Sequence, residues 1–251
     1  MKLKLKSFQL VTLDCFYDTW LQPFSQQMFS KILQLKLKGY LQEYSYGTLP
    51  VDTTDFLATH HALCQKINGE LIPVMAYKTM PFSRCRSHNL VFPALSILGR
   101  EGFEEHKKSV QAVLDQCTRE QTEISYDSSW TIDPEFRKDR ELATEFRNIF
   151  QMTHILHHQL SSRKVSMICG ILRFKTEKFF EKWGYEPLKT EKLEPLSPFQ
   201  HASLKSEPAI MMMASKFTES AKALAENYRE IWDSRILISP QALPETLKKV
   251  A

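Results

Sequence analysis

Glycine is scarce in this sequence, and its rarity bears on any site that would bind phosphate. Only seven of the 251 residues are glycine, and residues 130–146 (WTIDPEFRKDRELATEF) contain none. Glycine-rich turns let the backbone approach a phosphate closely and adopt positive φ. This segment otherwise has the order of a phosphate-binding strand, turn and helix. If it binds phosphate, side chains must replace the missing backbone contacts.

Cysteine motifs and long apolar runs are also absent. The five cysteines lie far apart and form no CxxC pair, which argues against a disulfide framework or a structural zinc site and for a reducing compartment. No apolar run reaches the length of a membrane span. The N-terminal MKLKLKSFQLVTL lacks the apolar core and cleavage site of a signal peptide, and it is expected to form a strand. We therefore expect a soluble, cytoplasmic protein.

A strong excess of one charge is missing as well. The net charge of +4 is dispersed, and no recognised basic and aromatic motif is present, which argues against a nucleic-acid-binding protein. The hydrophobic fraction of 43% and the charged fraction of 25% are those of an ordinary globular protein. The length suits one domain with a helical appendage. We expect a domain at residues 1–215 and a C-terminal helix and tail at 216–251, packed on that domain.

The hydrophobic pattern predicts an α+β fold. Asn68-Gly69 lies between two runs of strand formers and is a strong hairpin signal. A nearly all-apolar strand follows a strand and a long helical pattern, an order typical of a parallel crossover within a mixed sheet. In the first half we expect a strand at 8–13, helices at 16–44 broken near Pro23 and ended at Gly39, a hairpin at 56–80, a loop at 81–98 and a helix at 100–117. In the second half we expect strands at 123–132, 165–172, 185–193 and 206–214 and helices at 141–160, 176–184 and 217–232.

This order of elements resembles the Gcn5-related N-acetyltransferase (GNAT) superfamily. WTIDPEFR looks like the central strand of that superfamily, KVSMICGIL looks like the next strand, and KFFEKWGYEPL is similar to the segment that follows it. The resemblance covers roughly residues 8–215. It implies a mixed, mostly antiparallel central sheet flanked by helices, with a V-shaped splay between two parallel central strands.

The chain is most similar to one branch of the superfamily, the acyl-homoserine-lactone synthases and N-acyl amino acid synthases. This branch lacks the glycine-rich loop, and VDTTDF resembles its acidic D-x-x-D segment, with Asp52 and Asp55 ahead of the hairpin. Where the branch often has an arginine, at the end of the second hairpin strand, this chain has Lys78. The resemblance implies acyl transfer to the amine of a small, amino-acid-like acceptor, without a metal. The donor would be acyl-CoA or the acyl-phosphopantetheine arm of an acyl carrier protein.

The resemblance also implies where the acyl donor binds. Its arm would lie along the strand end at Ile132 and Asp133, with its phosphate at the start of the following helix. Arg137, Lys138 and Arg140 would hold that phosphate with their side chains. The same three residues also suit an ordinary solvated helix start, so both interpretations stay open at this point.

Two acids and one tyrosine are the candidate catalytic residues. Glu123 and Asp127 lie four residues apart on the central strand and therefore share one face, where the superfamily often places its base. We expect one of the two to be the base. Tyr185 follows the short helix, and it would either donate a proton to the thioester sulfur or pack the start of a strand.

Other features favour structural roles. His154, His157 and His158 share a helix, but no HExxH-type motif accompanies them, so a polar helix face is favoured over a zinc site. Cys85 lies among basic residues that would activate a thiol, although direct acyl transfer needs no such nucleophile. The alternative function is a protein that kept this fold, lost catalysis and binds a ligand or a protein partner.

Overall fold

A computed structural model describes residues 7–44, 48, 50–99 and 103–240. The chain divides into two compact units, and strands β3 and β4 and helix α8 run through both. The first unit comprises Met1–Thr79, Ser129–Ile149 and Tyr228–Ala251, and the second comprises Met80–Ser128 and Phe150–Asn227. Within the described residues nine strands form a mixed, mostly antiparallel sheet. No helix in this part of the chain is long and apolar enough to cross a membrane.

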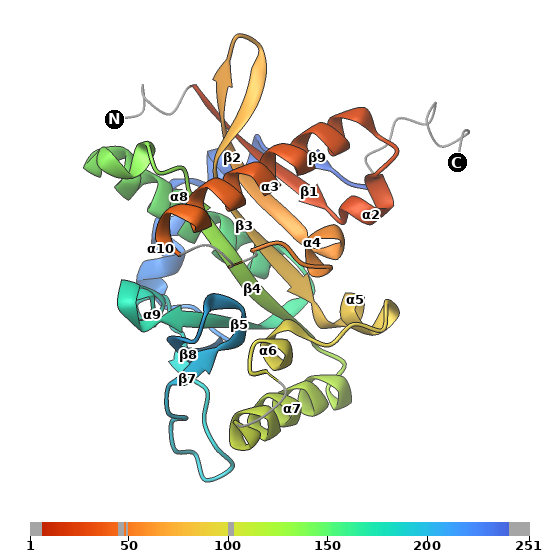
Figure 1. The fold of residues 1–251 in the computed structure, drawn as a ribbon, viewed down its shortest axis with the longest axis vertical. Helices are drawn as coiled ribbons and strands as arrows, with labels where there is room; N and C mark the ends of the chain where they lie inside the picture. Colours follow the sequence, from red (N-terminus) through yellow and green to blue (C-terminus); the bar gives the residue numbers. More distant parts are fainter. Residues whose placement is uncertain (1–6, 45–47, 49, 100–102, 241–251) are drawn as a thin grey trace. The chain divides into compact units, whose positions relative to one another are not determined.

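The sheet of the first unit is built around a long hairpin (Figure 1). Asn68 and Gly69 form its turn with φ values of 49° and 81°, the left-handed conformation that a tight hairpin turn requires. The strand order is β9-β1-β2-β3, with β1 antiparallel to β2, β2 antiparallel to β3 and β9 parallel to β1. These strands are β1 (Phe8–Asp14), β2 (Thr59–Ile67), β3 (Glu70–Pro81) and β9 (Ile236–Ile238).

Helix α3 (Pro23–Glu43) covers one face of this layer (Figure 1). Pro23 occupies the first helical position, where its missing N–H costs nothing. Apolar residues at three- and four-residue spacing then meet the strands: Met28, Phe29, Ile32 and Leu35 pack with Val11, Leu13, Ala62, Cys64, Ala76 and Ile238. Two short helices, α2 (Phe16–Thr19) and α4 (Thr54–Leu57), contact each other beside α3.

Gly39 lies inside α3, so the prediction that it ends the helix is wrong. A Cβ atom at this position would lie 2.1 Å from Thr131 Oγ1 and 3.3 Å from the guanidinium of Arg137. Gly39 is therefore present because the helix packs tightly against the end of β4 (Glu123–Ile132), and no chain reversal is involved.

The second unit contains the paired strand residues of the parallel crossover that the sequence predicts. Strand β4 runs parallel to β5 (Arg163–Ile171), and α8 (Arg140–Leu160) connects them. Strand β5 is antiparallel to β8, which also pairs with the short strands β6 and β7. The remaining elements of this unit are α5 (Phe82–Ser87), α6 (Pro93–Ser96), α7 (Glu104–Arg119), α9 (Thr176–Glu181), β6 (Glu186–Pro187), β7 (Phe199–His201), β8 (Glu207–Ala214) and α10 (Glu219–Asn227).

The pairing between β4 and β5 stops before either strand ends. The last paired residues are Asp127 and Ile168, although β4 continues to Ile132 and β5 to Ile171. Two residues past the last pair, Ser129 has φ of 60°, a left-handed conformation that a β-strand does not normally contain. This local bend in β4 directly follows the point where the two parallel strands cease to pair.

Several predicted elements need correction. Residues 185–193 are not one strand, because β6 contains two residues and a turn follows. The expected loop at 81–98 contains α5 and α6, and the expected helix at 217–232 is two helices, α10 and α11 (Arg229–Asp233). The predicted helix start at 100–102, the N-terminal residues 1–6 and the end of the tail at 241–251 lie outside the described residues. The division at residue 215 remains a prediction.

Candidate functional site

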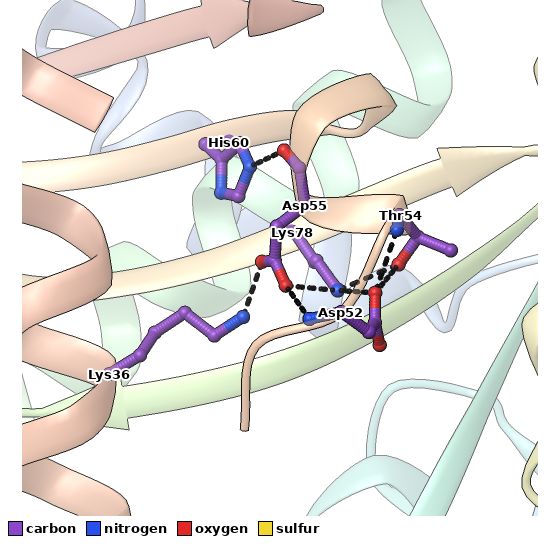
Figure 2. Close-up of polar contacts among 6 residues, drawn as sticks. All are labelled: Lys36, Asp52, Thr54, Asp55, His60 and Lys78. Atoms are coloured by element: carbon purple, nitrogen blue, oxygen red, sulfur yellow. Dashed lines mark hydrogen bonds and ion pairs between the residues drawn. The ribbon is translucent and has the colours of Figure 1, made fainter. Parts of the chain in front are cut away.

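A buried cluster of charges in the first unit joins α3, α4 and the hairpin (Figure 2). Asp55 is fully buried, and its carboxylate forms ion pairs with Lys36 from α3 and with Lys78 from β3, the latter at 3.0 Å. Lys78 also contacts Asp52 at 3.1 Å and donates to Thr54 Oγ1 at 2.7 Å. Four charged groups thus neutralise one another, which is the arrangement that buried charges require.

The local sequence explains how the two aspartates are held. Asp52 Oδ1 accepts from the backbone N–H of Thr54, two residues on, at 2.8 Å, as an aspartate in a turn does. In return Asp55 Oδ2 accepts from the backbone N–H of Asp52 at 2.9 Å. His60 Nε2 donates to the backbone oxygen of Asp55 at 2.7 Å. The D-x-x-D spacing therefore builds a reciprocal turn that aims Asp55 inward and leaves Asp52 at the surface.

The electrostatics of the cluster follow from its burial. Burial raises the pKa of Asp55, but the charges of Lys36 and Lys78 outweigh that effect and lower it to about 2. Burial and the nearby Lys78 lower the pKa of Lys36 to about 8. Burial lowers the pKa of His60 to about 4, so this histidine is neutral at pH 7. Asp55, held between two ammonium groups, is the ionised centre of the cluster.

Sequence reasoning placed Asp52, Asp55 and Lys78 near the hairpin but missed Lys36 and its contact. The signal was present, because Lys36 occupies a place in the buried stripe of α3, between Ile32 and Gly39. A lysine on an otherwise apolar helix face predicts a buried acidic partner. The ring of His60 is buried and bonded to the backbone, which indicates a structural role.

The expected donor-binding residues lie together at the end of β4. Ile132 is buried, and the backbone N–H of Asp133 donates to the oxygen of Val74, the extra residue at the bulge between β2 and β3. The Asp133 carboxylate forms an ion pair with Lys38 of α3 at 2.9 Å. Arg137 Nε donates to the backbone oxygen of Ile132 at 2.9 Å, and its Nη1 pairs with Glu43. Arg137 thus contacts Ile132 and Glu43, which belong to the same unit as Arg137.

The helix start after β4 already holds a carboxylate. Asp139 Oδ1 accepts from the backbone N–H groups of Glu141 at 3.0 Å and Leu142 at 3.1 Å. These first-turn N–H groups are the ones that a phosphate at a helix N-terminus would use. Lys138 and Arg140 are exposed on either side of Asp139. Of the three basic residues expected to hold phosphate, these two are the ones presented to solvent.

Two of the three predicted catalytic residues meet in a buried network of the second unit. Asp127 Oδ2 accepts from Ser166 Oγ, which lies 2.6 Å from the hydroxyl of Tyr185. The Tyr185 hydroxyl in turn lies 2.5 Å from His154 Nε2. All four side chains are buried. Ser166 and His154 were not predicted as partners of the candidate base, because their positions on a strand and a helix carry no local motif.

Glu123 does not join this network. It is partly exposed at the start of β4, and its Oε1 accepts from the backbone N–H of Ser83 at 3.1 Å. Cys85, weighed as an activated thiol, is buried, and burial together with the charge of Glu123 raises the pKa of this thiol to about 12. The structure therefore contradicts the electropositive setting expected for Cys85.

The histidines of α8 contact other side chains of the second unit. Within the described residues no group of three His, Cys, Asp or Glu side chains is placed to hold a metal ion. His157 contacts Arg163 at 2.8 Å, and His158 packs edge-on against Phe217. These two histidines and His154 therefore have structural contacts within the second unit.

Comparison with solved structures identifies the fold. No protein-family model and no curated protein sequence matches the chain. The structure is similar to that of BjaI, a CoA-dependent acyl-homoserine lactone synthase solved with SAM and isopentyl-CoA, with 12% identity, a TM-score of 0.52 and 92% of each chain covered. The N-acyl amino acid synthase FeeM from uncultured soil microbes gives 14% identity and a TM-score of 0.47, over 83% of this chain and 91% of that one. The AHL synthase LasI gives 9% and 0.46, over 82% and 87%. The chain has a GNAT-like fold.

Proposed function

We propose that the protein is an acyltransferase that moves an acyl group from acyl-CoA or an acyl carrier protein to the amine of a small, amino-acid-like acceptor. The amine nitrogen attacks the thioester carbonyl, the C–S bond breaks, and the thiolate leaves. A base takes the proton lost by the amine and then returns it to the departing thiolate, which becomes a free thiol. Asp127 is the proposed base, and the reaction needs no metal.

The main support for this proposal is the point at which β4 and β5 cease to pair. Pairing stops at Asp127 and Ile168 in a fold similar to that of BjaI, which was solved with isopentyl-CoA. Where two parallel strands cease to pair, the edge of a strand can bond an amide-bearing arm such as phosphopantetheine. The proposed donor residues Ile132, Asp133, Lys138 and Arg140 follow on the same strand and helix start.

The charge cluster supports the acceptor half of the proposal. Asp52 is its most exposed member, with 63% of its side chain accessible. In Figure 2 every contact drawn to its carboxylate uses Oδ1, and the second oxygen points away from the cluster. A carboxylate fixed by Lys78 and Thr54 is preorganised for an ammonium group. We assign Asp52 to the acceptor amine.

Donor binding tests the proposal directly. The purified protein is titrated with acetyl-CoA, octanoyl-CoA and an acylated carrier protein, with thermal shift and calorimetry as readouts. We expect saturable stabilisation by at least one donor and, with a panel of amino-acid-like amines, release of free thiol and an N-acyl product by mass spectrometry. An Asp52→Asn variant should retain donor binding and lose product formation. If no donor binds at up to millimolar concentration, the proposal is wrong.

A second candidate is a ligand-binding or protein-binding protein without catalysis. It is favoured by Asp139, whose carboxylate occupies the first-turn N–H groups of α8, and by Arg137, which is paired with Glu43. Donor binding without thiol release toward any amine would support this alternative over the enzyme.

A further inference from the structure

Four buried side chains of the second unit form an unbroken row of hydrogen bonds. The row runs from Asp127 on β4 through Ser166 on β5 and Tyr185 after α9 to His154 on α8. None of the four is more than 3% exposed. The two ends also approach each other, with His154 Nε2 3.9 Å from Asp127 Oδ2. Because this polar row is enclosed, its hydrogen positions are set by protein groups and not by solvent.

The number of hydrogens decides the direction of each bond. Ser166 has a single hydroxyl hydrogen, and an ionised Asp127 can only accept, so this hydrogen points to Asp127. The contact between Ser166 and Tyr185 must then use the phenolic hydrogen of Tyr185. That leaves the Tyr185 oxygen as acceptor from His154, whose Nε2 must carry a hydrogen. An ionised carboxylate at one end therefore sets the tautomer of the imidazole at the other.

We infer that Ser166 and Tyr185 form a proton relay that couples the protonation state of Asp127 to that of His154. When His154 is an imidazolium, its Nε2 hydrogen moves to Tyr185, the Tyr185 hydrogen moves to Ser166, and the Ser166 hydrogen moves to Asp127. Three O–H or N–H bonds break and three form. A pair of opposite charges becomes a neutral carboxylic acid and a neutral imidazole, and the reverse shift restores the pair.

The surroundings of His154 favour the neutral end state. Burial lowers its pKa, Asp127 opposes this effect, and Arg163 adds to it. His154 also contacts the rings of Trp183 and Phe217, and its neighbour one turn on is His158. An apolar, aromatic shell of this kind stabilises a neutral imidazole and gives little support to a lasting ion pair.

The relay gives Tyr185 a different task from proton donation to sulfur. Its use in acyl transfer rests on the proposed function: the Ser166 hydroxyl, held in turn by Tyr185, orients Asp127, which takes the proton of the attacking amine. Ser166, Tyr185 and His154 are then positioning residues that act through Asp127. The hydrogen order itself does not depend on any acyl donor, so it can be tested in the protein alone.

The test is the tautomer of His154, read from ¹⁵N NMR spectra of protein labelled at histidine, with His154→Gln to assign the signal. In the natural protein at pH 7 we expect hydrogen on Nε2. In Ser166→Ala, Tyr185 is released to donate to His154, and the hydrogen should move to Nδ1. Ser166→Thr keeps the hydroxyl and should retain the Nε2 tautomer. Asp127→Leu frees the Ser166 hydrogen to point toward Tyr185 and should behave like Ser166→Ala.

The outcomes separate the relay from the proposed reaction. An Nδ1–H tautomer in the natural protein, or an unchanged tautomer in both Ser166→Ala and Asp127→Leu, overturns the relay. If neither variant folds by near-ultraviolet circular dichroism, the spectrum of the natural protein alone decides. A confirmed tautomer switch with no acyl transfer leaves the relay standing and removes only its catalytic use.

Discussion

The Oδ1 atom of Asp139 accepts a hydrogen bond from the backbone N–H of Leu142, at 3.1 Å. This carboxylate occupies the place where the proposed donor phosphate would bind. We predict that Asp139→Ala costs about 0.5–2 kcal/mol of stability, since it removes a helix cap. The same change should strengthen acyl-CoA binding, because the freed N–H groups favour an anion. Urea unfolding and calorimetry measure the two effects, and weaker donor binding would exclude a phosphate at this helix start.

Lys138 and Arg140 are predicted to attract the donor. Replacing both with alanine should weaken acyl-CoA binding several-fold, and the effect should shrink at high salt because both side chains are exposed. Lys192→Ala, which removes an exposed lysine from a distant loop of the sequence, is the matched control. Equal affinities for the double variant and the control would remove these two residues from the donor site. Arg137 is a poorer choice, since its loss also breaks contacts with Ile132 and Glu43.

Removing the charge of only one partner in the Lys36–Asp55 ion pair should strongly lower the free energy of unfolding. Asp55→Asn leaves two buried ammonium groups with reduced compensation, and we expect it to lower the free energy of unfolding by about 3–5 kcal/mol. Combining Lys36→Met with Asp55→Asn should recover part of this loss. The pair of half-buried Lys31 and exposed Glu70 provides the control, because Glu70→Gln should cost at most about 1 kcal/mol. Urea titrations at pH 7 compare the four proteins, and equal losses at both sites would contradict a buried pair.

His60 should make the protein less stable in mild acid. Burial lowers its pKa from 6.5 to about 4 in the folded state. Between these values the unfolded chain binds more protons, so stability falls as the pH drops from 6.5 toward 4, at up to about 1.4 kcal/mol per pH unit. The half-buried His158 and the buried His201, with pKa values of about 4, act in the same direction. Asp55 extends the loss below pH 4, because its folded pKa of about 2 lies under its ordinary 3.8.

The contribution of His60 can be isolated by substitution. His60→Gln keeps a donor for the backbone oxygen of Asp55 and removes the titrating ring. The free energy of unfolding, measured with urea at several pH values from 7 to 4.5, should therefore fall less steeply with decreasing pH in the variant. The difference in slope should correspond to at most one proton taken up on unfolding. If the free energy of unfolding depended on pH equally in the natural protein and the variant, His60 would have the same pKa in the folded and unfolded states.

Gly39 is predicted to resist a change that usually helps a helix. In an open helix position, Gly→Ala stabilises by about 1 kcal/mol. Here the new methyl group would meet Thr131 Oγ1 at 2.1 Å, so we expect Gly39→Ala to destabilise the protein by about 1–3 kcal/mol. The double variant with Thr131→Ala should regain most of this loss, and Thr131→Ala alone is the control. Thermal unfolding compares the three, and a stabilised Gly39→Ala would show that the helix can shift away.

The elements that the sequence predicted well are those whose signals are local. The hairpin was correct because Asn68-Gly69 has few alternatives to a tight turn, and the β4–α8–β5 crossover was correct because its apolar periods are long. Gly39 was misread, since a glycine that ends a helix and one that admits a neighbour look the same along the chain. Residues 185–193 were misread because strand formers after Gly184 gave no sign of the turn that follows β6.

For the candidate site too, the sequence predicted the residues that have a local signal and missed their partners. Asp52 and Asp55 were found through their spacing, and Asp127 through its place on the central strand. The partners that define their chemistry, Lys36 and Ser166, come from elements distant in sequence, and only packing brings them close. The sequence could indicate that Lys36 is unusual in an apolar stripe, but it could not name the partner. Nor could it show that the Asp139 carboxylate caps the N-terminus of α8.

The hairpin turn at Asn68 and Gly69 is a suitable place to insert a tag. A side chain at Gly69 would meet no atom within 4 Å, and the neighbouring residues of β2 and β3 are exposed. A surface turn of this kind tolerates inserted peptides because its backbone supports no other element. A fluorescent or affinity tag placed between Asn68 and Gly69 would report on ligand binding and capture partners, while both chain ends stay unmodified.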